Sequence, residues 1–361
     1  MNEKVYIVGA RLQTDDQREA LESFRELSLL LDTLGAEVVG RNFQVIKIPS
    51  RSHLFGKGKV AEIKEAIGEF NPDRIVFDYP LSPLQTKNLE EDLKRPVVDR
   101  SGIIIEVFAK HATTREGKLQ VELAQLKYKL PRLTDRSMNY DQQTGGGGSA
   151  YLRGAGERKI ELVKRRLRQD IRKLGDRIEE VRRHRQTQAK RRERWKMPIV
   201  SLVGYTNAGK STLLNAITGA DILSQDKLFS TLETTVRQRF MDGKKILFTD
   251  TVGFIRNLPV ELVAAFRSTL EEVLSASILM VVFDSSDPEW ERHIEVVDGI
   301  LSDLGADHIE KMYVANKIDQ IDETKQDEIL GEFPDVLFVS AKEKVGIDEL
   351  LDVINDKLNE I

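Results

Sequence analysis

Near its centre the chain reads Gly204-Tyr205-Thr206-Asn207-Ala208-Gly209-Lys210-Ser211, and this stretch decides the fold of the part around it. The apolar run 199–203 precedes it and the helix-like run 212–216 follows it. Two glycines let backbone N–H groups close around a phosphate, and the helix that follows points its positive end at the anion. The full spacing and the strand in front argue against an ordinary glycine-containing turn. The pattern therefore predicts a phosphate-binding loop between a strand and a helix.

The side chains of this loop suit a nucleoside triphosphate with its magnesium ion. Lys210 is placed to reach the β- and γ-phosphates, and the Ser211 hydroxyl is placed to complete a Mg²⁺ shell. The residues expected to bind the nucleotide here are Gly204, Asn207, Ala208, Gly209, Lys210, Ser211 and Thr212.

Two later motifs, each at the end of an apolar strand, indicate that the base is guanine. In Asn316-Lys317-Ile318-Asp319 the carboxylate of Asp319 can accept from the N1–H and the exocyclic amine of guanine, a donor pair that adenine lacks. Asn316 would brace the loop, and the stem of Lys317 would lie along the ring. Ser340-Ala341-Lys342 matches the usual third base contact, in which the Ala341 N–H meets the guanine oxygen. Each motif alone is weak evidence, but their order behind a phosphate loop predicts a guanine-nucleotide site.

Two segments are expected to respond to the γ-phosphate. Asp250 follows a strand and is placed to hold Mg²⁺ through water, and the Gly253 N–H is placed to sense the γ-phosphate, so hydrolysis would release this segment. In the other switch, residues 229–237, we choose Thr235 as the Mg²⁺ and γ-phosphate ligand, with Thr234 as its rival. The predicted catalytic groups are therefore Lys210, Thr235 and Gly253.

Residue 254 is Phe, where Ras-type enzymes carry the glutamine that orients the attacking water. Intrinsic hydrolysis should be slow, with a partner or another group in cis positioning the water. An Asn at the position of Asn207 occurs in GTPases that bind K⁺ beside the phosphates, which makes K⁺ a candidate second cation. Equal turnover in K⁺ and Na⁺ buffers at matched ionic strength would remove this hypothesis.

The composition limits the class of protein. The 361 residues, 40% of them hydrophobic, suffice for two or three domains. The chain has no cysteine, which excludes disulfide scaffolds, thiolate zinc sites and cysteine nucleophiles. The first residues begin a strand pattern rather than a signal peptide, and the apolar run 278–283 is too short to cross a bilayer. We expect a cytoplasmic protein without stable membrane insertion, which can associate peripherally with a membrane.

The sequence predicts an α/β fold class in three parts. Residues 1–115 alternate strand-like and helix-like stretches and predict a small α/β domain with a mainly parallel sheet. Residues 198–361 form the predicted P-loop GTPase domain, also with a mainly parallel sheet. In the first part we expect strands at 5–8, 37–40, 74–77 and 96–99 and helices near 16–34, 58–69 and 83–94.

Residues 116–197 are predicted to form an antiparallel helical hairpin that links these two parts. Its connector, residues 134–155, contains four consecutive glycines and needs a partner to become ordered. Apolar residues recur at steps of three and four in both halves, as two packed helices require. They are Leu119, Leu123, Leu126, Leu130 and Leu133 in the first, and Ile160, Val163, Leu167, Ile171, Leu174, Ile178 and Val181 in the second.

Positive charge is concentrated in the second half of this hairpin. Residues 151–198 hold 18 Lys and Arg against 7 Asp and Glu, a net of +11, so the −4 of the whole chain leaves −15 for the remainder. A long cationic helix with a mobile tip suits insertion between the phosphates of a large folded RNA, and a merely solvated helix face is the alternative. The candidate RNA contacts are Arg153, Arg158, Lys164, Arg165, Arg182 and Arg183.

Over nearly the whole chain these residues resemble the HflX family of ribosome-associated GTPases, within the Obg-HflX group. Outside the nucleotide motifs, the most specific match is Glu116-Gly117-Lys118-Leu119-Gln120-Val121-Glu122-Leu123-Ala124-Gln125-Leu126. Residues 55–59, 98–102 and 250–259 also match. One departure is Ala155 in Arg153-Gly154-Ala155-Gly156-Glu157, where the family usually has proline, and the loss of proline loosens the hairpin tip.

The resemblance implies a GTPase that ribosomes stimulate, that binds the large ribosomal subunit and its rRNA, and that dissociates or rescues stalled ribosomes. Such a protein is expected to bind GTP and GDP. We expect no DNA partner, and we expect the free protein to be a monomer. Two alternatives remain open. One is a GTP-dependent switch that recruits a protein partner, and the other is ATP-dependent RNA remodelling by the N-terminal half, because some family members bind ATP there.

Overall fold

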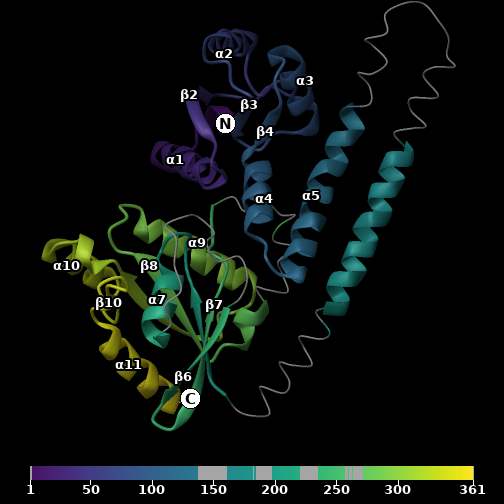
Figure 1. Ribbon diagram of the computed structural model, residues 1–361. Helices are drawn as coiled ribbons and strands as arrows, with labels where there is room; N and C mark the ends of the chain where they lie inside the picture. Colours follow the sequence, from purple (N-terminus) through teal and green to yellow (C-terminus); the bar gives the residue numbers. More distant parts are fainter. Residues whose placement is uncertain are drawn as a thin grey trace, which may run out of the picture. The chain divides into compact units, whose positions relative to one another are not determined.

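The structure, a computed structural model, describes residues 2–136, 161–181, 183, 197–219, 235–256, 259, 262 and 271–360 (Figure 1). The chain divides into two compact units. The first contains residues 1–110 and 118–179 with a short piece at 259–265, and the second contains 111–117, 180–258 and 266–361. The helical hairpin predicted at 116–197 is thus shared between them, with residues 118–179 in the first unit.

The first unit is built on a four-stranded parallel sheet of order β2-β1-β3-β4, which confirms the predicted small α/β layer (Figure 1). Helices α2 and α3 bury their apolar sides in one cluster with alternate strand residues, among them Ile63, Leu89 and Phe77. The strands are β1 (Lys4–Leu12), β2 (Glu37–Ile46), β3 (Arg74–Asp78) and β4 (Val97–Asp99). The helices between them are α1 (Gln17–Leu34), α2 (Lys57–Phe70) and α3 (Pro83–Leu93).

Helix α4 (Arg100–His111), which the sequence pattern did not predict, begins directly at the end of β4. It is buried on most of its circumference, so its sequence lacks the polar face that marks a surface helix. Its first residue, Arg100, is 4% exposed and donates to Asp78 at 3.1 Å and to Glu26 of α1. This buried ion cluster joins α1, β3 and α4.

Helix α5 (Arg115–Arg136) and a helix over residues 161–181 form the described part of the predicted hairpin. In the second helix Leu174 is buried, and Leu167 and Ile171 are half-buried among exposed charged residues, as the predicted seam requires. Val163, predicted for the same seam, is 48% exposed instead. The glycine-rich connector lies almost entirely outside the described residues.

Asp99, the last residue of β4, joins α5 to the sheet. Its carboxylate is 2% exposed and accepts four hydrogen bonds. Oδ1 accepts from the Gly102 N–H at 3.0 Å and the Tyr128 hydroxyl at 2.7 Å, and Oδ2 accepts from the Leu81 N–H at 3.2 Å and Arg132 at 2.7 Å. Burial, together with the charge of Asp99, raises the pKa of Tyr128, so this phenol stays a donor. Two residues of α5 are therefore bonded to one buried carboxylate of the sheet.

The second unit has a six-stranded sheet of order β10-β9-β8-β5-β7-β6, parallel except for the edge strand β6. This confirms the α/β class with a mainly parallel sheet. The strands are β5 (Ile199–Val203), β6 (Thr235–Met241), β7 (Lys244–Asp250), β8 (Ile278–Asp284), β9 (Glu310–Asn316) and β10 (Leu337–Val339). The helices are α7 (Lys210–Thr218), α9 (Trp290–Asp303), α10 (Glu323–Glu332) and α11 (Ile347–Glu360), with 3₁₀ turns η1 (Glu271–Ser275) and η2 (Ile318–Gln320).

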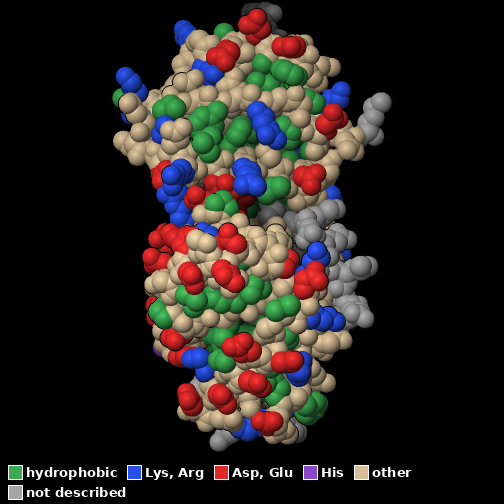
Figure 2. All heavy atoms as spheres, turned by 90° about the vertical axis from the view of Figure 1, so that its left-hand side faces the viewer, with side chains coloured by type: hydrophobic (Ala, Val, Ile, Leu, Met, Phe, Trp, Pro, Cys, Tyr) green, Lys and Arg blue, Asp and Glu red, His purple; other side chains and the backbone are tan. Residues whose placement is uncertain are grey.

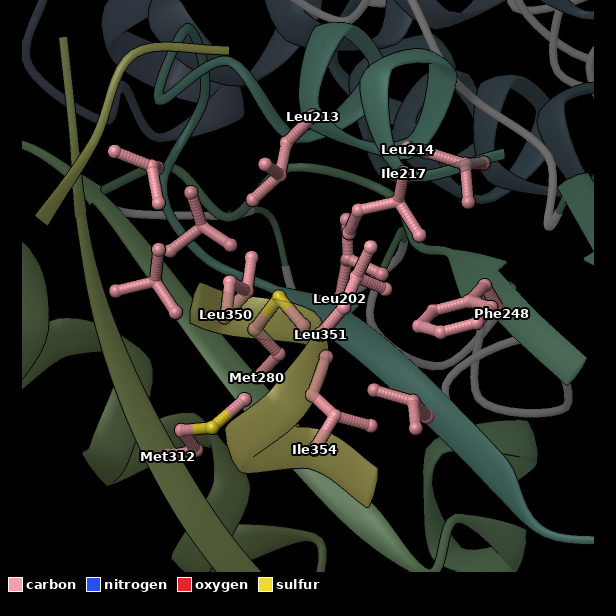
Figure 3. Packing of buried hydrophobic residues seen from close by; sticks show 14 of the residues in the cluster. Leu202, Leu213, Leu214, Ile217, Phe248, Met280, Met312, Leu350, Leu351 and Ile354 are labelled. Carbon is pink, nitrogen blue, oxygen red and sulfur yellow. The ribbon is translucent and has the colours of Figure 1, made fainter. Parts of the chain in front are cut away.

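Helices α7 and α11 cover one face of this sheet and α9 covers the other. Figure 3 shows Leu213 and Ile217 of α7 and Leu350 of α11 over the strand residues Leu202 and Met280. On the opposite face a second apolar cluster packs α9 against β5 and β8. These two cores hold the carboxyl ends of the parallel strands at one edge. Among the described residues, no helix is long and apolar enough to cross a bilayer.

Candidate nucleotide site

The carboxyl ends of five strands in the second unit bring the predicted motifs to one edge of the sheet. Gly204 follows β5, while Asp250, Asp284 and Asn316 are the last residues of β7, β8 and β9. Ser340 follows β10. In open parallel sheets, ligands bind in the crevice outside these ends.

The loop between β5 and α7 has the backbone of a preformed anion site. Asn207 and Gly209 both have positive φ angles, +62° and +85°, which turns successive N–H groups toward one concavity. Gly209 could carry no side chain, because a Cβ there would lie 2.2 Å from Nδ2 of Asn316. At Gly204 a Cβ would lie 2.1 Å from the carbonyl oxygen of Val282. The sequence thus needs both glycines for close approach.

Lys210 begins α7 and is 6% exposed. Its ammonium donates to the carbonyl oxygens of Gly204 at 3.0 Å and Tyr205 at 2.7 Å. Burial lowers the pKa of Lys210 to about 8, and the nearby charge of Asp250 opposes this effect. The loop therefore holds a desolvated cation at its centre, where an anion would be strongly attracted.

We expect the affinity for GTP to fall as the pH rises above about 8, where free Lys210 loses its proton. A bound phosphate favours the ammonium form, so the pKa of Lys210 rises on binding and binding takes up a proton above pH 8. The expected slope is about tenfold in the dissociation constant per pH unit. Calorimetric titrations with GTP between pH 7 and 9 measure this slope. The Lys210→Met variant is the control, because the pH dependence of its GTP affinity comes from all other groups. A wild-type affinity that stays constant over this range would contradict the assignment.

Ser211 and Asp250 present oxygen ligands beside the loop. The Ser211 hydroxyl donates to Oδ2 of Asp250 at 2.6 Å, so a hydroxyl and a carboxylate oxygen already face each other. Mg²⁺ prefers hard oxygen ligands and usually takes one or two protein side chains plus phosphates and waters. This pair fits that pattern. Among the described residues, no cluster of three metal-binding side chains offers a cage made by protein alone.

The segment after β7 lies against the phosphate loop. The Thr206 N–H donates to the carbonyl of Phe254 at 2.8 Å, and the Phe254 N–H donates to the carbonyl of Gly204 at 3.1 Å. A Cβ on Gly253 would lie 3.1 Å from Nζ of Lys210, which shows how close this backbone comes to the lysine. Thr235 opens β6 opposite Asp250 in the β6–β7 register, and Thr234 lies outside the described residues.

The predicted base-binding residues also meet. Asn316 is 2% exposed and donates to the carbonyl of Ala208 at 2.9 Å, while its Oδ1 accepts from the Ala341 N–H at 3.0 Å. The N–H predicted for the guanine oxygen is thus engaged with Asn316 here. The Ser340 hydroxyl donates to Oδ1 of Asp319 at 2.6 Å, which orients that carboxylate. One asparagine therefore links the phosphate loop to the base-binding loop.

Lys317, in the left-handed region with φ +68°, pairs with Asp284 at 2.6 Å. Asp284 was not among the predicted residues, because only the fold brings the ends of β8 and β9 together. Thr212 lies in α7 beside the loop, and Lys342 is exposed next to Ala341.

Sequence reasoning also missed the surroundings of Tyr205. Its ring stacks on His293 of α9 with ring centroids 3.9 Å apart, and its hydroxyl accepts from the Arg256 N–H at 2.9 Å. Burial lowers the pKa of His293, and Arg256 adds to the effect while Asp287 opposes it. These residues come from three separate segments, so no local pattern could reveal their contact.

The candidate RNA contacts lie apart from the nucleotide site in the chain. Lys164 and Arg165 are on the helix over residues 161–181, where Lys164 lies 4.0 Å from Glu161 and Arg165 is exposed. Arg183 is helical and exposed. Arg153, Arg158 and Arg182 lie outside the described residues.

Three family models match the chain. The GTP-binding GTPase N-terminal model matches residues 21–109, the GTP-binding GTPase middle region matches 111–192, and the 50S ribosome-binding GTPase model matches 199–317. The last match contains the phosphate loop and Lys317.

Curated relatives and solved structures agree with these models. GTPase HflX of Caldanaerobacter subterraneus is 43% identical over 98% of this chain and 80% of its own length, and GTPase HflX of Escherichia coli is 39% identical over 95% and 80%. A GTP-binding protein from Sulfolobus solfataricus, crystallised with GDP, is similar with a TM-score of 0.50 at 25% identity over 99% of both chains. The crystal structure of the SsGBP and GDP complex has a TM-score of 0.52 at 25% identity and covers 100% of this chain and 98% of its own. These matches indicate GTP hydrolysis, and the chain belongs to the HflX family of GTPases.

Proposed function

We propose that this GTPase is a switch that binds the large ribosomal subunit in its GTP state and dissociates or rescues stalled ribosomes. The observation that carries the proposal is the separation of charge along the chain. Residues 199–361 hold 15 Lys and Arg against 30 Asp and Glu, so this part alone has a net charge of −15. Residues 151–198 have a net charge of +11. We call residues 151–198 the arm. Its excess of positive charge suits it to an RNA surface, whereas the acidic residues 199–361 are not suited to one.

The described part of the arm supports this assignment. On the helix over residues 161–181 the side chains of Arg165, Arg172 and Arg177 are exposed, whereas Leu174 is buried and Leu167 and Ile171 are half-buried. The space-filling view in Figure 2 shows Asp and Glu side chains spread widely over the visible face of the second unit. An RNA surface would therefore repel residues 199–361 and attract residues 151–198, which favours docking through the arm. The description of the matched model, a 50S ribosome-binding GTPase, names the same class of partner.

At the nucleotide site we propose the finer assignments made from the sequence. Ser211 would bind Mg²⁺ directly, Asp250 would hold it through water, and Thr235 would complete its shell and contact the γ-phosphate. Gly253 would donate its N–H to the γ-phosphate, and Asn207 would provide the place for a K⁺ ion. The hydrogen bond from Ser211 to Asp250 and the register of Thr235 opposite Asp250 support the Mg²⁺ set.

Sedimentation of intact ribosomes with the full-length protein tests the proposed function. With a non-hydrolysable GTP analogue we expect the protein to move with the large subunit and the intact-ribosome peak to shrink, and with GDP we expect neither. Added large subunits should raise GTP turnover by at least about tenfold, because a bound partner can orient the catalytic groups of a GTPase. Equal binding in the GDP and analogue states, or unchanged turnover with a folded, GTP-binding protein, would contradict the proposal.

Neutralising positive charges of the arm tests whether they bind RNA. Replacing Arg165, Arg172 and Arg177 together by Gln should weaken binding to large subunits and reduce the slope of log affinity against log salt by about 0.7 to 0.9 for each lost phosphate contact. The control removes three cations of the second unit, Lys244, Lys325 and Lys357. If the protein instead recruits a protein partner, its binding to that partner should be unchanged in both variants.

A further inference from the structure

Phe254 cannot take part in hydrolysis from its position in the structure. The residue is 2% exposed, and its ring belongs to the apolar cluster that packs Val203 and Leu279 against Val297 of α9. The side chain that follows Gly253 therefore turns into the core, away from the phosphate loop. Another group must contact the attacking water if the chain hydrolyses GTP by itself.

Thr206, the third residue of the phosphate loop, has a buried hydroxyl without a hydrogen-bond partner. The residue is 7% exposed, and among the residues that the structure describes its Oγ1 has no hydrogen-bond partner. The backbone of the same residue is fixed, because the Thr206 N–H donates to the Phe254 carbonyl at 2.8 Å. Buried hydroxyls are nearly always bonded, so this one calls for a partner that arrives later.

The neighbouring hydroxyls are already engaged. The Ser211 hydroxyl donates to Asp250 at 2.6 Å, and the Thr251 hydroxyl donates to the Leu202 carbonyl at 2.8 Å. Deeper in the sheet, Ser201 and Thr249 bond to each other at 2.7 Å. The unbonded oxygen at Thr206 is thus distinct from the other hydroxyls of this region that the structure describes.

Thr206 lies beside two groups that are expected to contact the γ-phosphate, Gly253 and Lys210. A Cβ built on Gly253 would lie 3.0 Å from both Cα and Cγ2 of Thr206 and 3.1 Å from Nζ of Lys210. Three groups therefore surround one small volume: the threonine side chain, the lysine ammonium that reaches the β- and γ-phosphates, and the Gly253 backbone. The threonine is the hydroxyl-bearing member of this set.

We propose that the Thr206 hydroxyl is a catalytic group that donates to a γ-phosphate oxygen and accepts a hydrogen bond from the attacking water. The water oxygen bonds to the γ-phosphorus as the bond from phosphorus to the β–γ bridging oxygen breaks. The electron pair of that bond stays on GDP, and the water proton passes to the released phosphate. Thr206 is unchanged at the end of the step. The proposal rests on GTP hydrolysis at this site and is independent of the ribosomal partner.

Single-turnover GTP hydrolysis by three Thr206 variants tests the proposal. Thr206→Val keeps the shape and removes the hydroxyl, Thr206→Ala removes the bulk as well, and Thr206→Ser keeps the hydroxyl. At saturating GTP we expect the rate constant to fall on the order of 100-fold in the Val and Ala variants and to stay within about threefold of wild type in the Ser variant. The affinity for GDP, which lacks the γ-phosphate, should be unchanged in all of them.

Thermal unfolding of the nucleotide-free variants separates this role from a structural one. Loss of a hydroxyl without a partner should leave the Tm of the Val variant equal to or above that of wild type, whereas a structural role would lower it. Thr218→Val, which removes a bonded hydroxyl at the far end of α7, is the matched control and should hydrolyse GTP at the wild-type rate. Wild-type hydrolysis by the Ala variant, or a Ser variant as slow as Ala, would overturn the proposal.

Discussion

Replacing Lys210 by Met is expected to lower the affinity for both GTP and GDP by about 10² to 10³, because one partner of a buried, charge-assisted contact is lost. The ammonium is buried in the loop, and among the described residues it donates to two carbonyl oxygens, those of Gly204 and Tyr205, at 3.0 and 2.7 Å. Its charge is thus directed to the anion that the loop receives. Calorimetry with each nucleotide measures the loss.

The same substitution should not destabilise the nucleotide-free protein. Burial already lowers the pKa of Lys210, which means that its charged form is poorly solvated there. A methionine of similar length removes this unfavourable charge. Lys325→Met, at an ion pair with Glu328 on α10, is the control for losing a lysine elsewhere. A Lys210→Met variant that binds GTP as wild type would refute the site, and a variant that no longer folds would refute the stability argument.

Replacing Asp319 by Asn is expected to exchange guanine for xanthine specificity. The carboxylate accepts from two donors of guanine, whereas xanthine has a carbonyl in place of the exocyclic amine. An asparagine could keep its oxygen toward the Ser340 hydroxyl, which donates to Oδ1 of Asp319 at 2.6 Å, and point its amide nitrogen at that carbonyl. The GTP affinity should fall by about 10² to 10³, since the amide nitrogen of asparagine would face the exocyclic amine of guanine, donor against donor, and the XTP affinity should rise.

Competition binding of GTP, XTP and ATP measures this exchange directly. Asp322→Asn is the matched control, because Asp322 caps α10 by accepting from the Lys325 N–H at 2.9 Å and asparagine caps as well as aspartate does. The control should keep the wild-type preference for GTP. An Asp319→Asn variant that still prefers GTP over XTP would show that the base is bound elsewhere or through other groups.

The phosphate loop and the base motifs were predictable because each is a short, local pattern at the end of a strand. The structure confirms that Gly204, Asp250, Asn316 and Ser340 lie at the same edge of one sheet. Helix α4 was not predictable in this way. Its Ile103-Ile104-Ile105 run is β-branched and lacks a polar face, because both the sheet and other helices cover it.

Contacts between distant segments were also beyond the sequence. His293 stacks on Tyr205 only because α9 packs under the phosphate loop, and nothing local to either residue indicates the pair. That the Thr206 hydroxyl lacks a hydrogen-bond partner can be recognised only when the positions of the neighbouring groups are known. Patterns identify the residues that a motif requires, whereas the partners of those residues depend on the packing of the whole unit.

The buried carboxylate of Asp99 anchors the C-terminal half of α5 to the sheet. Moving α5 away from the sheet would break the hydrogen bonds from Tyr128 and Arg132 to Asp99. The buried carboxylate would then lose its cationic partner, which is costly. A pull on the far part of α5 is therefore transmitted to the end of β4 and, through Gly102 and Leu81, to α4 and the approach to α3. A displacement of this part of α5 would therefore disturb the carboxyl end of β4 and the start of α4.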